Sequence, residues 1–117
     1  MTTSPDQSPI QDELAALAAE LEKGIAFHRA GDLVGAIQVY AGLLSQKPDY
    51  ADALHLMGEA LYRQGRLKQA LGYLNLAIAT APHHFFLNTR ANVLLSMGLL
   101  MEAQQDLKRA LNQAPDY

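Results

Sequence analysis

The sequence contains no cysteine and no long apolar run, and each absence narrows what the chain can do. Without cysteine it can form neither a disulfide framework nor a thiolate metal site, and it has no cysteine nucleophile. No apolar run approaches the roughly 20 residues that a membrane-spanning helix needs. The first residues, MTTSPDQSPIQDE, lack the basic flank and apolar core of a signal peptide. These absences predict a soluble cytoplasmic protein with no membrane partner.

The net charge of the chain is also small. Lys and Arg number 9 against 12 Asp and Glu, which gives a net charge of -3. A nucleic-acid partner held by electrostatic attraction is therefore not expected. Half of the residues are apolar, so the 117-residue chain has enough apolar side chains for one folded domain.

The most informative feature that is present is an internal repeat. Three sets of residues recur with spacings of 34 and then 33 positions. Because independent markers keep one register, the pattern indicates repeated structural units. The sets are the prolines Pro48, Pro82 and Pro115, the glycines Gly31, Gly65 and Gly98, and the alanines Ala36, Ala70 and Ala103.

Each repeat predicts a pair of helices. In the second repeat, Leu54, Met57 and Leu61 recur at helical spacing, and Gly65 ends the helix. A second apolar pattern follows over residues 67–81 and stops at Pro82. A small residue in each first helix, Gly58 in this repeat, is expected where the two helices approach closely.

This period and pattern resemble the tetratricopeptide repeat. The family's small residue, aromatic, alanine, aromatic and proline fall here on Gly24, Phe27, Ala36, Tyr40 and Pro48. The resemblance covers about residues 17 to 117. It implies an all-α, right-handed superhelix of three helix-turn-helix repeats, whose first helices line a concave surface. The expected repeats are about 17–50, 51–83 and 84–117.

The N-terminal region predicts an extended first helix. Ser8 is a suitable N-cap before Pro9, so we expect residues 1–8 to be disordered and a single domain over 9–117. The helix would run to about Arg29, about two turns longer than a repeat helix. Its extension carries an apolar seam that either packs on the first repeat as a cap or makes a dimer contact. The seam consists of Ile10, Leu14, Leu17 and Leu21.

The C-terminal sequence Pro115-Asp116-Tyr117 copies Pro48-Asp49-Tyr50, which opens the second repeat. Asp49 is a suitable N-cap there, whereas no helix follows Asp116. A solenoid normally ends in a polar capping helix, yet here Leu107 and Leu111 would lack a neighbour. We therefore expect either a fragment of a longer array or a C-terminal face that stacks on another copy.

No catalytic constellation accompanies the repeats. The sequence has no phosphate-binding glycine loop, nucleophile elbow or metalloprotease motif. His83 and His84 are adjacent in the turn after Pro82, but no third metal ligand is near in sequence. The chain is therefore predicted to be no enzyme and to carry no cofactor or metal.

The predicted function is a protein-interaction scaffold that binds a peptide or protein segment in the concave groove. The first helices place a mixed, nearly charge-balanced set of polar side chains on that surface, and such a set suits hydrogen bonding to a peptide. Many of these residues could equally be ordinary exposed helix positions. The predicted groove residues are His28, Arg29, His55, Glu59, Tyr62, Arg63, Asn88 and Asn92.

Comparison within the family leaves two alternatives open. The residues 87–94 resemble repeats of O-GlcNAc transferase and of bacterial arrays that precede glycosyl-, sulfo- or methyltransferase domains. The chain could thus be the N-terminal recruiting or oligomerisation region of a larger bacterial transferase. It could also be a self-assembling scaffold that uses the Leu14, Leu17 and Leu21 seam or the open C-terminal face. The clamp with which some family members grip acidic chaperone tails is absent, because other residues occupy its positions: Leu21, Ile25, Leu56, Phe85 and Thr89.

Overall fold

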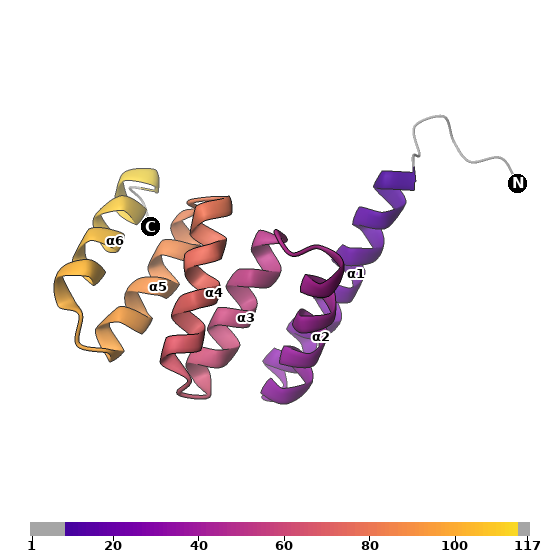
Figure 1. Cartoon of the computed structure of the whole chain (residues 1–117), viewed down its shortest axis with the longest axis horizontal. Coiled ribbons are helices and arrows are strands. Elements are labelled where there is room, and N and C mark those ends of the chain that lie inside the picture. Colours follow the sequence, from indigo (N-terminus) through magenta and orange to yellow (C-terminus); the bar gives the residue numbers. More distant parts are fainter. Residues whose placement is uncertain (1–8, 115–117) are drawn as a thin grey trace, which may run out of the picture.

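The computed structural model describes residues 9–114, and this part of the chain contains six α-helices and no strand. Consecutive helices pair as antiparallel hairpins, and the hairpins stack side by side into an all-α helical solenoid (Figure 1). The predicted fold class is confirmed. The helices are α1 (Pro9–Arg29), α2 (Leu33–Gln46), α3 (Ala51–Arg63), α4 (Leu67–Thr80), α5 (His84–Ser96) and α6 (Leu100–Gln113).

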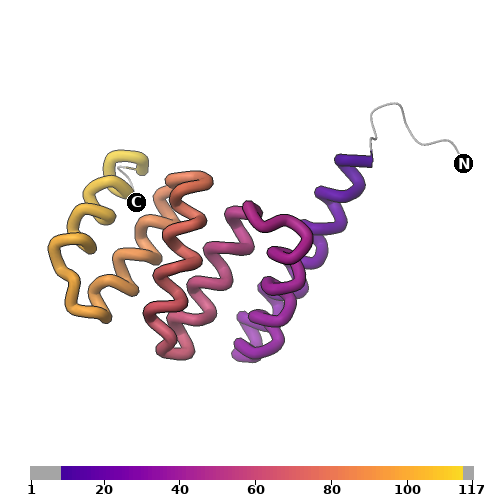
Figure 2. The backbone as a smooth tube through the Cα atoms, viewed as in Figure 1, coloured from indigo at the N-terminus to yellow at the C-terminus, as the bar shows by residue number. Residues whose placement is uncertain are grey.

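The stack is elongated, with extents of 57 × 32 × 23 Å. Each helix packs mainly against the helices before and after it in the sequence, while α3 also contacts α1 and α5 (Figure 2). The three first helices α1, α3 and α5 are therefore neighbours along one side of the stack. No helix among residues 9–114 is both long and apolar enough to cross a membrane.

Each hairpin turns at a glycine in the left-handed region of backbone space. Gly31, Gly65 and Gly98 have φ values of 83°, 79° and 80°. A side chain would clash with the backbone in this conformation, so glycine is the residue that ends a helix there at little cost. The repeated glycines therefore mark the turn within each repeat.

A second pair of glycines permits close helix packing. A Cβ atom on Gly24 would lie 2.5 Å from Tyr40 Cε1, and one on Gly58 would lie 2.7 Å from Leu74 Cγ. Tyr40 and Leu74 are both fully buried in the second helix of their repeats. The prediction that small residues allow the first helix to approach the second is confirmed.

The apolar seam on α1 is only partly covered. Leu21 is buried and Leu17 packs against the same core, whereas Ile10 is 67% exposed and Leu14 is 51% exposed. The predicted cap that packs on the first repeat is therefore wrong for the first two turns of α1. These turns extend beyond the level at which α2 ends, so no other helix of the described chain reaches them (Figure 1).

The N-cap of α3 differs from its prediction. Tyr50 is the cap residue and makes no side-chain cap bond, while the Asp49 carboxylate accepts a hydrogen bond from Lys47 Nζ at 2.9 Å. Asp49 was thus wrongly assigned as the cap, because the nearby ammonium competes for its oxygens. The predicted Ser8 cap, the disordered segment 1–8 and the terminal Asp116 lie outside the described residues.

The last repeat exposes part of its apolar surface. Leu111 is 49% exposed, although the equivalent residue one repeat earlier, Ile78, is 8% exposed against α5. Leu107 is half-buried because it packs within its own repeat against Leu94 and Ala103. Of the two predicted exposed leucines, only Leu111 lacks cover within residues 9–114.

Candidate functional site

The groove face is defined here by the eight predicted residues on the first helices. The helix α1 contributes His28 and Arg29, and α5 contributes Asn88 and Asn92. The remaining four lie on α3, between the other two helices. These four are His55, Glu59, Tyr62 and Arg63, so all eight lie on the first helices of the three repeats.

A pocket of about 240 Å³ opens on this face between α1 and α3. Four of the eight predicted residues line it, together with two apolar side chains that the prediction did not include in the site. The pocket therefore combines an apolar lining with charged groups. Its lining residues are Ile25, His28, Arg29, Leu56, Glu59 and Arg63.

His28 is more buried than a groove residue was expected to be. Its side chain lies between the helices of the first repeat at 8% exposure, and its Nδ1 lies 3.3 Å from the Tyr40 hydroxyl. Burial lowers the pKa of His28, and Arg63 lowers it further while Glu59 opposes the shift. Its Nε2 is buried without a hydrogen-bond partner among residues 9–114. His28 thus forms the inner wall of the pocket, since the ring turns toward α2.

His55 links α3 to α5. Its Nε2 lies 2.8 Å from Thr89 Oγ1, and the Thr89 hydroxyl donates to the Phe85 carbonyl at 3.0 Å. Because the Thr89 hydroxyl proton is used in this way, its oxygen accepts a hydrogen bond from the Nε2–H of His55. Burial lowers the pKa of His55, although Glu59 opposes the shift, so the neutral ring is favoured. His55 therefore holds neighbouring repeats together and is only half-exposed to a ligand.

The charged groups of the pocket are unequally satisfied. Glu59 Oε1 lies 3.6 Å from Arg63 Nη2, which is a loose pair on the surface of α3. Arg29 is exposed and has no ion-pair partner among residues 9–114. The pocket thus carries an excess positive charge that an acidic group on a ligand would neutralise.

The remaining groove residues differ in whether their side chains already make hydrogen bonds within the described chain. The Tyr62 hydroxyl accepts a hydrogen bond of 3.4 Å from Ser96 on α5, so it too bridges two repeats. Asn88 is half-buried and Asn92 is exposed, and neither makes a side-chain hydrogen bond within residues 9–114. The two amides retain donors and acceptors that could pair with a peptide backbone.

Comparison with known families agrees with the repeats and the helix pairs. A family model described as Tetratricopeptide repeat matches residues 27–85. The chain belongs to the tetratricopeptide repeat family. No curated protein sequence matches it.

Solved structures of this family superimpose well. The Thermobaculum terrenum O-GlcNAc transferase, a K341M mutant, is 28% identical with a TM-score of 0.86, and the match covers 100% of this chain and 21% of that one. This chain therefore spans about a fifth of that transferase. The first tetratricopeptide domain of Spaghetti (RPAP3), bound to the HSP90 peptide SRMEEVD, is 22% identical with a TM-score of 0.83. That match covers 86% of this chain and 81% of the other, and at this identity it shows the fold alone.

An ion pair inside the third tetratricopeptide repeat was not predicted. Arg90 donates to both carboxylate oxygens of Asp106, at 2.7 and 2.6 Å, and to Asn75 Oδ1 at 3.1 Å. The equivalent positions of the second repeat hold Met57 and Tyr73, which pack in its core. The sequence offered one signal of this pair: opposite charges replace both apolar residues at equivalent positions of the next repeat.

The adjacent histidines have a structural role in this tetratricopeptide domain. His83 Nδ1 accepts a hydrogen bond of 3.2 Å from the Phe85 backbone, which caps α5, and the rings of His83 and His84 stack at 4.3 Å. Among residues 9–114, no three His, Cys, Asp or Glu side chains gather as a metal site would require.

Proposed function

We propose that this tetratricopeptide domain is a protein-interaction scaffold whose groove face binds an extended peptide carrying an acidic residue. The observation that supports the proposal is the α1–α3 pocket, to which four of the eight predicted groove residues contribute. In this role the chain acts by binding and needs no catalytic group or cofactor.

The pocket suggests how such a peptide would sit. An acidic side chain would pair with Arg29, whose guanidinium is otherwise without an ion pair in the described chain. The apolar contribution of Ile25 and Leu56 favours an apolar neighbour beside that acidic residue. Further along the face, Asn88 and Asn92 would bind the peptide backbone through their amides.

Hydrogen bonds between neighbouring repeats order the groove face before a ligand binds. The bonds from His55 to Thr89 and from Ser96 to Tyr62 fix α3 relative to α5. A ligand then meets a largely ordered face, so less conformational entropy is lost on binding. The HSP90 peptide bound by the Spaghetti domain is an example of a peptide ligand on this fold.

The proposal is tested by selecting peptides from a random display library and measuring their affinity by fluorescence anisotropy. The combined variant Arg29→Ala and Asn92→Ala should weaken binding at least about tenfold, because it removes a charge-assisted bond and a backbone contact. Arg109→Ala, an exposed substitution on α6, serves as the matched control and should leave affinity unchanged. Equal binding by the folded double variant would contradict the assignment of this face.

A second candidate is a recruiting module within a longer transferase. The observation that favours it is the 28% identity over the whole chain with the Thermobaculum terrenum O-GlcNAc transferase. An immunoblot of the native protein in its own cells tests this candidate. A species much larger than 12.8 kDa would support it, and a species of 12.8 kDa would rule it out.

A further inference from the structure

A larger apolar site lies away from the groove face, between the second helices α2 and α4. This α2–α4 notch has a volume of about 640 Å³, and α3 forms its floor. In the orientation of Figure 1, α3 is visible between α2 and α4. The notch is lined by Ile37, Ala41, Met57, Leu61, Arg66, Gln69, Gly72, Tyr73 and Leu76.

Its apolar character is not a requirement of the repeat. The equivalent notch between α4 and α6 measures about 310 Å³, and its lining includes Asn75, Glu102 and the ion pair of Arg90 with Asp106. In that notch, the side chains of Asn75 and Asp106 both accept hydrogen bonds from Arg90. The α2–α4 notch instead exposes Leu76, at 55%, to solvent.

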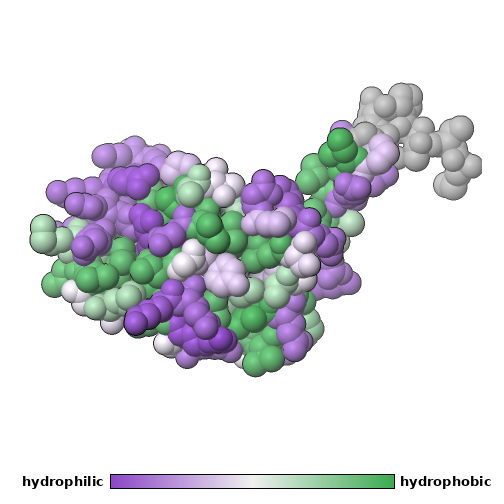
Figure 3. Space-filling model, in the orientation of Figure 1, coloured by the Kyte–Doolittle hydropathy of each residue, from purple (hydrophilic) through white to green (hydrophobic). Residues whose placement is uncertain are grey.

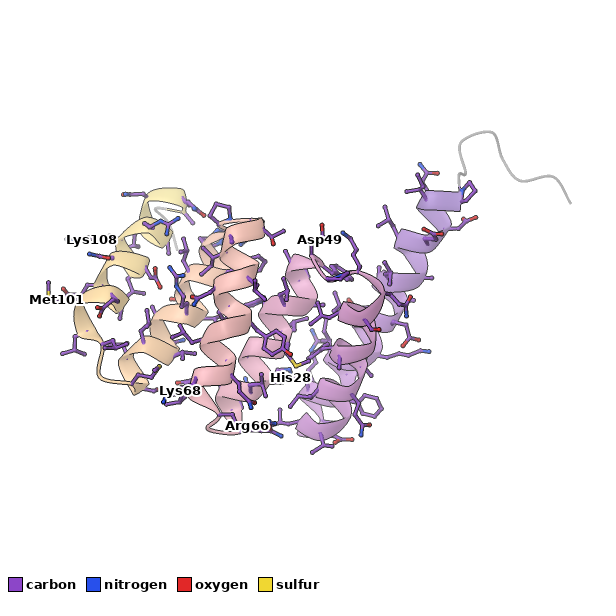
Figure 4. All side chains as sticks on the ribbon, in the orientation of Figure 1. His28, Asp49, Arg66, Lys68, Met101 and Lys108 are labelled. Atoms are coloured by element: carbon purple, nitrogen blue, oxygen red, sulfur yellow. The ribbon has the colours of Figure 1, made fainter. Side chains whose placement is uncertain are left out.

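The lower edge of the α2–α4 notch is basic. Arg66, the N-cap residue of α4, lines the notch, and Lys68 lies two residues further along the chain, near the start of α4 (Figure 4). Arg66 donates to the side chain of Gln64, and neither cation has an ion-pair partner within residues 9–114. In Figure 3, hydrophilic surface lies at the lower end of α4, below green surface. An occupant that pairs an apolar face with a carboxylate would complement both.

The projecting end of α1 has this chemistry. Ile10 and Leu14 are exposed. Figure 3 shows green surface on the projecting part of α1. At 3.6 residues per turn, Glu13 lies about 60° around the helix from Ile10, beside the apolar seam, whereas Asp12 lies about 160° away. Neither carboxylate has an ion-pair partner in the described chain.

We propose that the projecting end of α1 of one copy docks in the α2–α4 notch of a second copy. Ile10 and Leu14 enter the apolar notch, and Glu13 pairs with Arg66. The helix cannot reach its own notch, since α1 runs uninterrupted from Pro9 to Arg29 and points away from α4 (Figure 1). Because the contact joins two different surfaces, copies either exchange their helix ends in a closed dimer or add on into larger assemblies.

Charge reversal tests the polar half of this contact. Sedimentation velocity of the full chain over a range of concentrations should show species above 12.8 kDa. Glu13→Lys or Arg66→Glu alone should raise the dissociation constant about tenfold, and the two together should restore association. Asp12→Lys makes the same charge change in the same turn on the opposite face, so it should have no comparable effect. A monomer at every concentration, or reversals that do not compensate, would overturn the proposal.

Cross-linking tests which surfaces meet, and the absence of native cysteine makes the result easy to interpret. Leu14→Cys mixed with Leu76→Cys should give a disulfide-linked dimer of the two variants under mild oxidation. Leu14→Cys mixed with Leu111→Cys, an exposed apolar position on α6, is the matched control. A mixed disulfide only with Leu111→Cys, or only between two Leu14→Cys chains, would show a different interface and refute docking in the notch.

Discussion

Gly58 shows how much the packing of one repeat depends on a single residue. A Cβ atom at this position would lie 2.7 Å from Leu74 Cγ and 3.2 Å from the Ala70 carbonyl oxygen. Leu74 is fully buried and the carbonyl belongs to α4, so neither can withdraw freely. We expect Gly58→Ala to lower the free energy of unfolding by roughly 1–3 kcal/mol, measured by urea denaturation.

The matched control for this prediction is Gly42, a glycine inside α2. A Cβ atom there would meet nothing within 4 Å. Since alanine favours helix more than glycine does, Gly42→Ala should raise the free energy of unfolding by roughly 0.5–1 kcal/mol. If Gly58→Ala were equally stabilising, close approach would not be the reason for glycine at that position.

Residue-level assignments from sequence succeeded where backbone conformation decided them and failed where neighbours competed. The turn glycine Gly65 was predictable because a positive φ excludes other residues. Aspartate is a common N-cap residue, but the Asp49 carboxylate binds the Lys47 ammonium instead, with Nζ 2.9 Å from Oδ1. His28 was assigned to the groove by helical spacing, yet it is 8% exposed, and its Nδ1 lies 3.3 Å from the Tyr40 hydroxyl on α2. Spacing alone does not resolve how deeply a residue at the border between the groove and the core is buried.

At the scale of elements, the third repeat holds its two helices together differently from the second. The pair of Arg90 with Asp106 is mostly buried, with side-chain exposures of 20% and 4%. Asp106→Ala would leave the Arg90 guanidinium without its carboxylate, and we expect a loss of about 3 kcal/mol in the free energy of unfolding. Chemical denaturation followed by circular dichroism would measure it.

The combined variant Arg90→Met and Asp106→Tyr distinguishes a need for charge from a need for packing. It installs the residues that the second repeat carries at the same positions, Met57 and Tyr73. Replacing a buried ion pair by packed apolar groups is often neutral or stabilising, so stability should return to at least the native value. A double variant as unstable as Asp106→Ala would show that this repeat requires the ion pair.

The extent of each element was largely predictable, whereas what covers it was not. The bounds of α1, Pro9 to Arg29, follow from an N-terminal proline and a turn glycine. The seam spacing also predicted an apolar face on that helix. It could not reveal that Ile10 and Leu14 lie beyond the reach of α2, because that depends on the relative lengths of packed helices.

At the scale of the whole molecule, the chain is a row of neighbours without a single central core. The buried residues fall into three clusters along the stack, and the third consists of Ala91, Leu94 and Ala103 alone. A repeat in the middle is stabilised by interfaces on both sides, whereas an end repeat has one. The groove face and the α2–α4 notch both involve α3, in the best-supported part of the stack.

This distribution predicts graded protection from amide hydrogen exchange. The helices α4 and α6 have the same length of 14 residues, so they can be compared directly. Because α4 has packed neighbours on both sides and α6 on one, amides in α6 should exchange faster, as should those of α1 before Leu17. Exchange followed by NMR at low protein concentration would measure both. Equal protection in α4 and α6 would mean that the three repeats open as one cooperative unit, so that local differences in packing do not govern how the molecule unfolds.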